Sequence, residues 1–209
     1  MTCLIISGGQ FCELPAGIEY DYVIACDHGY NHAKQLNITP DLIIGDFDSY
    51  IGTIDEATDI SIEKHPVMKD DSDTMLAIKH ALSKGYNNII IICAMGGRFD
   101  HSYANIQSMA YVANHGGTCT LYADKDIMQV LSGPNTISIN KKTSYSLSLF
   151  SVTDTCTDLC ISGSSYDVKN VELTNTFPLG LSNHIEAESA QISIGSGILL
   201  IVQSFIPDK

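Results

Sequence analysis

The stretch Asp41-Leu-Ile-Ile-Gly-Asp-Phe-Asp-Ser49 joins a short apolar run to an acidic end. Residues 42–44 predict a strand buried on both faces, and Gly45 allows the backbone to turn after it. Asp46 and Asp48 follow where ligands bind in open α/β sheets, beyond the carboxyl end of a strand. Alternate residues of an extended segment point the same way, and paired carboxylates suit a hard cation such as Mg²⁺. A simple polar turn is the alternative.

Strands and helices alternate in the first part of the chain. Short apolar runs predict strands, and apolar residues at helical spacing predict helices between them. The predicted strands are Thr2–Ser7, Tyr22–Cys26, the Asp41 stretch, Ile60–Glu63, Asn88–Ala94 and Thr118–Tyr122. The predicted helices are Asn31–Leu36, a segment that ends near Lys84, and His101–Asn114. Because the connections are short, this order predicts a parallel sheet flanked by helices.

The pattern changes after about Asp126. Short segments rich in Ser, Thr, Ile and Val, separated by Gly, Asn and Pro, predict an antiparallel β-sandwich or barrel. The predicted strands are Ile137–Ile139, Tyr145–Phe150, Val168–Leu173, Gln191–Ile194 and Ile198–Gln203. We therefore expect α/β followed by all-β: a Rossmann-like parallel-sheet domain over residues 1–130 and a C-terminal antiparallel β-sandwich over residues 131–209.

Composition limits the classes of partner. The 209 residues carry a formal net charge of -13, which argues against nucleic-acid binding, because contacts to phosphates require clustered Lys and Arg. No apolar run is long enough to span a membrane. The seven cysteines are an odd number and show no CxxC spacing, and several lie in apolar runs. They predict reduced thiols and a cytoplasmic protein.

Acidic residues recur where predicted strands end or helices begin. They form four sites: Asp27, the Asp46/Asp48 pair, the Asp70/Asp71/Asp73 cluster, and Asp100. Strand ends of a parallel sheet share one edge, so we expect these sites to meet there. Clustered carboxylates repel one another, and such a cluster therefore favours a bound metal ion. Each site also has a structural alternative as a helix cap or turn residue.

Arg98 supplies a cation beside Gly96 and Gly97. A guanidinium next to flexible backbone suits a phosphate group, whereas an ion pair with Asp100 is the structural alternative. His28 flanks a site residue, and both a ligand contact and a capping or solvated role are open. The sequence contains no HExxH, GxSxG or P-loop motif.

Taken together, these residues resemble the thiamin pyrophosphokinase family. The matching stretches are Cys26-Asp-His-Gly-Tyr-Asn-His32, Pro40-Asp-Leu-Ile-Ile-Gly-Asp-Phe-Asp-Ser49, Lys69-Asp-Asp-Ser-Asp-Thr74, Gly96-Gly-Arg-Phe-Asp-His-Ser-Tyr-Ala-Asn105, Leu181-Ser-Asn183 and residues 192–200. The similarity covers nearly the whole chain, with order and spacing intact. It implies an ATP-binding Rossmann-like domain, a β-sandwich that helps to bind thiamin, dependence on Mg²⁺, and a homodimer with thiamin at the subunit interface.

The resemblance also implies roles for individual residues. The implied catalytic residues are Asp46, Asp71, Asp73 and Asp100, and the implied metal ligands are Asp46, Asp48, Asp71 and Asp73. The residues implied to bind ATP are Asp27, His28, Asp48, Arg98 and Asn105, and those implied to lie near thiamin are Ser182 and Asn183. The chain departs from the family at His28, where a second Gly is usual, and at His184, where Glu is frequent. Both departures leave the roles of these histidines open.

The activity implied is transfer of the diphosphate of ATP to the hydroxyl of thiamin, with AMP as the leaving group. The metal and Arg98 would neutralise charge on the transferred group, and the proton acceptor is open among Asp71, Asp73 and Asp100. One alternative is a Mg²⁺-dependent phosphohydrolase in which the first Asp of Asp-x-Asp is the nucleophile and Lys79 assists; the β-rich second half does not fit it. A module that senses Mg-ATP without turnover is another, and it would release no AMP.

Overall fold

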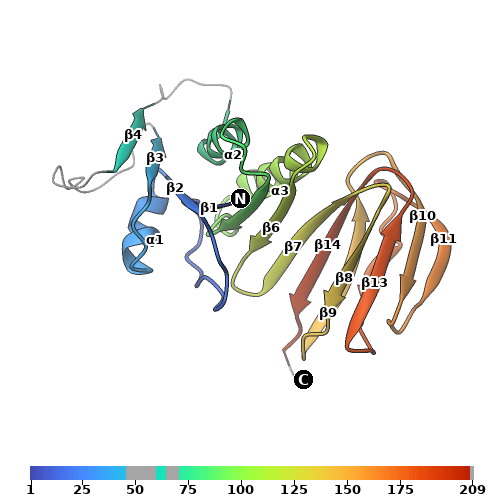
Figure 1. Cartoon of the computed structure of the whole chain (residues 1–209). Helices are drawn as coiled ribbons and strands as arrows, with labels where there is room; N and C mark the ends of the chain where they lie inside the picture. The colour runs from blue at the N-terminus through green and yellow to red at the C-terminus, as the bar shows by residue number, and fades with distance from the viewer. Residues whose placement is uncertain (46–59, 65–70, 208–209) are drawn as a thin grey trace. The chain divides into compact units, whose positions relative to one another are not determined.

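The computed structural model describes residues 1–45, 60–64 and 71–207. The chain divides into two compact units, and Figure 1 shows the elements of both. The first unit comprises Met1–Val112 and Cys119–Asp124, and the second comprises Ala113–Thr118 and Lys125–Lys209. The domain division at residues 130 and 131 falls inside a strand of the second unit and stays a prediction.

The first unit is built on the expected parallel sheet. Its strands are β1 (Thr2–Ile6), β2 (Tyr22–Cys26), β3 (Leu42–Gly45), β4 (Ser61–Lys64), β5 (Asn88–Ile92) and β6 (Thr118–Tyr122). Their order is β6-β5-β1-β2-β3-β4, and the pairs from β5 to β4 are all parallel. Residues along β1, β2 and β3 are almost continuously buried, which explains why these strands read as unbroken apolar runs rather than alternating ones.

Within the described residues, three helices accompany this sheet: α1 (Gly29–Gln35), α2 (Asp73–Ser83) and α3 (Phe99–Asn114). On one face of β1, Leu4 and Ile6 pack in a cluster that includes Ala33 of α1. Gly85, with φ +86°, follows α2 and supplies the left-handed residue that commonly ends a helix. Within the described part of the chain, no helix is long and apolar enough to cross a membrane.

The second unit is an antiparallel β-sandwich, as the sequence predicts. Its strands are β7 (Asp126–Ser132), β8 (Asn135–Asn140), β9 (Tyr145–Ser151), β10 (Thr155–Ser162), β11 (Val168–Thr174), β12 (Gly180–Asn183), β13 (Ser189–Ile194) and β14 (Ile198–Phe205). They form two layers, β12-β9-β14-β7 and β11-β10-β13-β8 (Figure 1). Neighbouring strands within each layer run antiparallel. Inward side chains of both layers, such as Leu149, Leu159, Ile192 and Leu199, share one core.

Candidate active site

The strands β1, β2, β3 and β5 end side by side, at what we call the carboxyl edge of the first unit. Backbone hydrogen bonds join the segments just beyond these strands. The Ser7 N–H donates to the Ile92 carbonyl at 3.0 Å, the Gly9 N–H to the Cys93 carbonyl at 2.7 Å, and the Asp27 N–H to the Ile44 carbonyl at 2.8 Å. The turns that carry the predicted site residues are therefore held in register by the sheet itself.

Gly29 brings the start of α1 against the end of β1. A Cβ atom at this position would lie 2.0 Å from the Ile6 carbonyl oxygen and 2.8 Å from its carbon. Backbone atoms cannot yield as a flexible side chain can, so only glycine fits here. This contact fixes the Asp27–Gly29 turn at the carboxyl edge.

The first turn of α2 is docked against the same edge. Ser72 caps the helix, because its Oγ accepts a hydrogen bond from the Met75 N–H at 3.2 Å. The buried Thr74 hydroxyl lies 2.9 Å from the Ser7 hydroxyl, just beyond β1. The Cys26 thiol at the end of β2 donates to the Asp73 carbonyl at 3.6 Å. Asp73 is thereby placed beside the carboxyl ends of β1 and β2.

Asp27 and His28 occupy the turn between β2 and α1. Asp27 has a left-handed backbone, with φ 45°, and directly follows the strand. His28 is exposed, and its Nδ1 lies 3.3 Å from Nδ2 of Asn31. Its ring packs edge-on against that of His32, which is itself buried and lies 2.9 Å from the Gly9 carbonyl through Nε2. The Asp27 turn and the Gly9 turn are thus coupled through two imidazoles.

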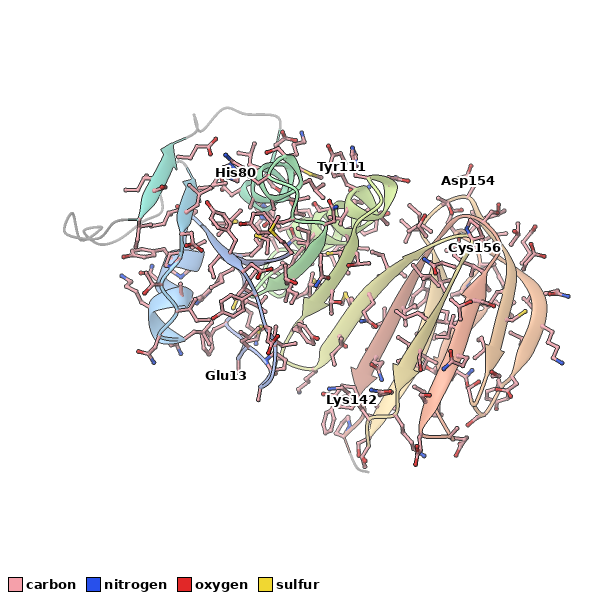
Figure 2. All side chains as sticks on the ribbon, in the orientation of Figure 1. Glu13, His80, Tyr111, Lys142, Asp154 and Cys156 are labelled. Atoms are coloured by element: carbon pink, nitrogen blue, oxygen red, sulfur yellow. The ribbon has the colours of Figure 1, made fainter. Side chains whose placement is uncertain are left out.

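Asp71 lies just before α2 and forms an ion pair with Lys79 of the same helix, with 2.6 Å between Oδ2 and Nζ. Lys79 Nζ also lies 6.0 Å from the ring centre of Tyr111 on α3. Figure 2 labels Tyr111, together with His80, the neighbour of Lys79 on α2. The mid-helix lysine is thus directed at Asp71, a carboxylate that stays a predicted site residue, although the sequence suggested Lys79 only for the phosphohydrolase alternative.

Arg98 and Asp100 form a two-pronged ion pair beyond β5. Arg98 Nε donates to Asp100 Oδ1 at 3.1 Å and Nη2 to Oδ2 at 2.5 Å, and both side chains are largely exposed. The hydrogen bond from Arg98 holds the pKa of the Asp100 carboxyl below its ordinary value, and the carboxylate in turn raises the pKa of Arg98. Arg98 therefore forms the ion pair with Asp100 that the sequence offered as its structural role. Because an exposed ion pair contributes little stability, this pair can open and leave the guanidinium to bind a phosphate.

Asn105 is buried on α3 and donates from Nδ2 to the Ala94 carbonyl at 2.6 Å. Ala94 belongs to the segment that leads from β5 to Gly96, Gly97 and Arg98. The Asn105 side chain on α3 therefore holds this loop in position through its hydrogen bond to the Ala94 carbonyl. Its predicted contact with the nucleotide stays a prediction.

Ser182 and Asn183 end β12 in the second unit. The Asn183 amide is buried and fully engaged: Oδ1 accepts from the N–H groups of Tyr166 and His184, and Nδ2 donates to Ser164 Oγ and the Tyr166 carbonyl. Ser182 is exposed and left-handed, with φ 62°, and its N–H donates to Ser148 Oγ at 3.0 Å. The Asn183 side chain therefore holds the connection between β10 and β11 against the end of β12, whereas the Ser182 side chain is exposed.

This difference predicts separate effects for the two residues. Asn183→Ala leaves the Tyr166 and His184 groups without their buried partner and should lower the free energy of unfolding by about 2 kcal/mol. Ser182→Ala should change stability by less than about 0.5 kcal/mol, and the role that the resemblance implies for Ser182 predicts a higher KM for thiamin. Urea unfolding and steady-state kinetics on both variants test this. Equal stability loss in the two, or an unchanged KM for thiamin in Ser182→Ala, would contradict it.

The described residues reproduce part of the predicted constellation. Asp27 and Asp73 come to the carboxyl edge of β1 and β2, whereas Asp100 is paired with Arg98 beyond β5. Asp46, Asp48 and Asp70 lie outside the described residues, so the predicted Asp46/Asp48 pair stays a prediction. Among the described residues, no three His, Cys, Asp or Glu side chains are grouped as metal ligands.

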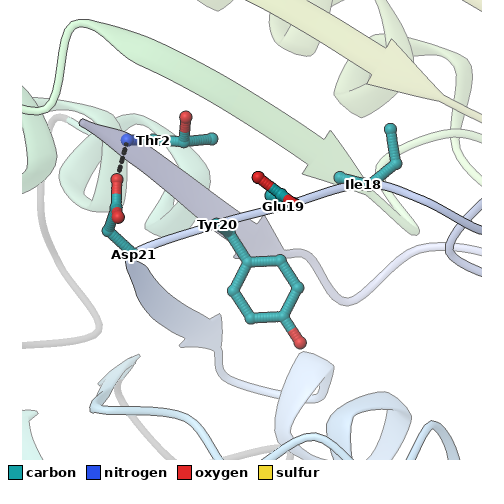
Figure 3. A pocket seen from close by; sticks show the side chains of 5 residues that line it. All are labelled: Thr2, Ile18, Glu19, Tyr20 and Asp21. Atoms are coloured by element: carbon teal, nitrogen blue, oxygen red, sulfur yellow. Dashed lines mark hydrogen bonds between the residues drawn. The ribbon is translucent and has the colours of Figure 1, made fainter.

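Sequence reasoning missed the Ser7–Thr74 contact and the two contacts of His32. The Ser7–Thr74 contact and the His32–Gly9 contact join segments far apart in the chain, so nothing in the local sequence marks them, whereas His28 and His32 are only four residues apart. A hollow lined by Thr2, residues 18–20 and Asp21 is shown in Figure 3. It lies where β1 and β2 begin, at the end of the strands opposite the carboxyl edge, and is not part of the site.

Comparison with known proteins gives the family. The model described as the thiamin pyrophosphokinase catalytic domain matches residues 18–121, and that of the thiamin pyrophosphokinase vitamin B1 binding domain matches residues 134–199. The chain belongs to the thiamin pyrophosphokinase family. The predicted ATP-dependent diphosphotransferase is therefore confirmed at the level of the family, and the phosphohydrolase alternative is set aside.

Individual relatives agree with this membership over their full lengths. A thiamine pyrophosphokinase of Bacillus subtilis (strain 168) is 28% identical over 215 residues, which cover 97% of this chain and 98% of the relative. A crystal structure of thiamine pyrophosphokinase from Bacillus subtilis superposes with a TM-score of 0.89 at 25% identity, covering 99% and 100% of the two chains. A thiamin pyrophosphokinase family protein from Enterococcus faecalis gives a TM-score of 0.83 at 28% identity, with both chains fully covered.

Proposed function

We propose that this chain transfers the diphosphate of ATP to the hydroxyl of thiamin and that the carboxyl edge of the first unit carries the reaction. The observation that supports this site is the docking of α2: Thr74 on Ser7 and the Asp73 backbone on Cys26 hold an acidic helix start against the ends of β1 and β2. A helix N-terminus also favours anionic groups through its unpaired N–H groups.

The donor chemistry of this edge fits Mg²⁺. The acidic groups placed there are carboxylates, and oxygen ligands are those that Mg²⁺ prefers. We propose Asp46, Asp48, Asp71 and Asp73 as the ligands, of which Asp71 would have to share its carboxylate with Lys79. When bound, the ion would neutralise charge on the polyphosphate and orient it for transfer.

The chain's own groups would complete the site around ATP. Arg98 exchanges its contact with Asp100 for a phosphate group, because a guanidinium binds either anion with two parallel hydrogen bonds. Asp27 and His28 contact the nucleotide from the β2–α1 turn, and Asn105 holds the Ala94 loop in place. Asp71, Asp73 and Asp100 remain candidates for the proton acceptor. The lowered pKa of Asp100 makes it a weaker base than an unpaired carboxyl.

The decisive experiment follows the phosphorus atoms. ATP labelled at the β-phosphorus, and separately at the γ-phosphorus, is incubated with the protein, thiamin and Mg²⁺. Both labels should enter the thiamin product in equal amount with the AMP released, and chelation of the metal should stop the reaction. Transfer of the γ label alone, with ADP as the second product, would overturn the proposal. Binding of ATP without AMP release would instead indicate the sensor.

We also propose a homodimer assembled through the second unit. Tyr166, Phe177, Leu179 and Leu181 are each more than half exposed. Three of them, Tyr166, Leu179 and Leu181, also line a small apolar pocket of the sandwich. Exposed apolar side chains gathered in this way are typical of a surface that a partner covers. A second copy is the occupant because the family resemblance implies a twofold assembly.

Light scattering should therefore give about twice the monomer mass of 22.6 kDa. Leu181→Asp should shift the protein towards the monomer, because a buried, unpaired carboxylate disfavours association. Ile62→Asp, at a comparably exposed apolar position on β4, serves as the control and should leave the mass unchanged. A wild-type mass near that of the monomer, with full activity, would exclude an obligate dimer.

We place the enzyme in the cytoplasm and expect no partner beyond ATP, thiamin and a second copy. All seven cysteines are free thiols, which supports a reducing compartment. The net charge of -13 disfavours both nucleic acid and anionic membrane surfaces.

A further inference from the structure

Two cysteines from distant parts of the chain face each other at the carboxyl edge. Cys12 lies in the irregular segment after β1, and Cys93 directly follows β5; both are buried. Their sulfur atoms are 3.9 Å apart. The other thiols of the chain are buried singly or bonded to other groups, so this pair is distinct among the seven.

The contacts between Cys12 and Cys93 are reciprocal. The Cys12 N–H donates to Cys93 Sγ at 3.4 Å, and the Cys93 N–H donates to Cys12 Sγ at 3.2 Å. The Cys93 thiol is also 3.5 Å from the Cys12 carbonyl, and the Cys12 thiol is 3.4 Å from the Tyr122 carbonyl. Cys93 adopts a left-handed backbone, with φ 56°, which is uncommon for a residue with a side chain. The backbone is thus arranged to bring two sulfur atoms together.

We propose that Cys12 and Cys93 form a redox-sensitive pair that a hydroperoxide converts into an intramolecular disulfide. The sulfur atoms need to approach from 3.9 Å to about 2.05 Å, the length of the covalent bond. The pair lies within the first unit, in the segments that follow the neighbouring strands β1 and β5.

The chemistry balances with one hydroperoxide molecule as the oxidant. The Cys12 thiolate attacks the terminal peroxide oxygen, which breaks the O–O bond, releases water or an alcohol, and leaves a sulfenic acid on Cys12. The Cys93 thiol then attacks that sulfur and a second water leaves as the disulfide forms. Two thiols lose two electrons and two protons, and the peroxide accepts both. A thiol reductant reverses the reaction by exchange.

The two thiols have the asymmetry that this order requires. The hydrogen bond from Cys93 lowers the pKa of the Cys12 thiol to about 7, against the opposing effects of burial and of Asp124 and Glu13. Glu13 is labelled in Figure 2. The same bond and burial raise the pKa of Cys93. Because the thiolate is the reacting form, oxidation should accelerate as pH rises.

The disulfide would change the backbone position of a segment that belongs to the active site that we propose. The Cys93 carbonyl accepts from the Gly9 N–H, and the Met95 carbonyl accepts from the Gln10 N–H at 2.8 Å. The segment that these bonds hold continues into Gly96, Gly97 and Arg98. Drawing Cys93 towards Cys12 shifts this segment, so oxidation is expected to reduce turnover several-fold. This consequence rests on the proposed function, whereas formation of the disulfide does not.

The test is oxidation of the full-length protein with hydrogen peroxide, followed by alkylation of the remaining thiols and peptide mapping by mass spectrometry. Two of the seven thiols should become unreactive, and a cross-linked peptide pair should join Cys12 to Cys93. Dithiothreitol should restore both thiols together with any lost turnover. A disulfide between other cysteines, or only singly oxidised thiols, would overturn the proposal.

Three variants sharpen this result. Cys12→Ser and Cys93→Ser should each abolish the cross-linked peptide, while Cys160→Ser, which removes the more exposed thiol, should leave it intact. If the disulfide forms in the wild type but turnover is unchanged, the pair is a modification site without control of the reaction. If no diphosphate transfer is found at all, the peptide map still decides whether the pair exists, because that map does not depend on activity.

Discussion

Replacing Asp73 by Asn is expected to lower turnover about 10²-fold or more while the fold is retained. Asp73 opens α2, and the Cys26 and Thr74 contacts hold this turn beside the ends of β1 and β2. Asn keeps the size and shape of the side chain but loses the charge that would position the metal and the polyphosphate. Asp46→Asn, in the other acidic motif, should give a similar loss, although Asp46 lies outside the described residues.

Stability must be separated from chemistry in this experiment, because Asp73 also favours the positive end of the helix dipole. Its loss should lower stability by about 0.3–1 kcal/mol. Ser72→Ala is the matched control: it removes the 3.2 Å cap bond to Met75 and should cost about 1 kcal/mol, but it keeps the carboxylate. Turnover in Ser72→Ala should stay within a few-fold of the wild type. Near-normal turnover in Asp73→Asn would refute the role of this carboxylate.

Gly29→Ala is expected to destabilise the protein by about 3 kcal/mol or more. The added Cβ would meet the Ile6 carbonyl oxygen at 2.0 Å, and this contact is with main-chain atoms that cannot rotate away. Either α1 moves off β1 or the Asp27 turn is distorted. We therefore expect a lower urea midpoint, and reduced turnover in whatever fraction remains folded.

Gly17→Ala provides the control for a glycine replacement. Gly17 has φ +82°, and a Cβ atom added there would meet no other atom within 4 Å, so only the left-handed backbone is penalised, by about 1 kcal/mol. The difference between the two variants measures the close approach at Gly29. Equal effects in both would show that the contact with Ile6 does not constrain the turn.

Much of the fold could be predicted from local patterns. The apolar runs at residues 2–6, 22–26 and 88–92 mark parallel strands because both faces of these strands are covered, and the start of α2 is marked by Ser72 followed by Asp73. Three strands of the sandwich, β7, β10 and β12, are not among the strands that the local patterns predict. β7 lies where a boundary between domains was expected. β10 contains Asp158 with φ 55° and a shift of register between Cys156 and Leu159, which breaks the alternation that reveals a strand.

The sequence by itself determined which chemical groups this protein carries and in which motifs they occur, whereas the tertiary structure decided which of these groups contact one another. Residue types and their spacing depend on neighbours a few positions apart, so they predict the acidic motifs, the sheet and the family resemblance. Partner choice depends on contacts between distant segments: Arg98 with Asp100 was foreseeable at a separation of two residues, but Ser7 with Thr74 and Cys12 with Cys93 were not. Asn183 shows the same limit, because only the packing of the sandwich reveals that its amide group is hydrogen-bonded to the backbone of Tyr166, between β10 and β11.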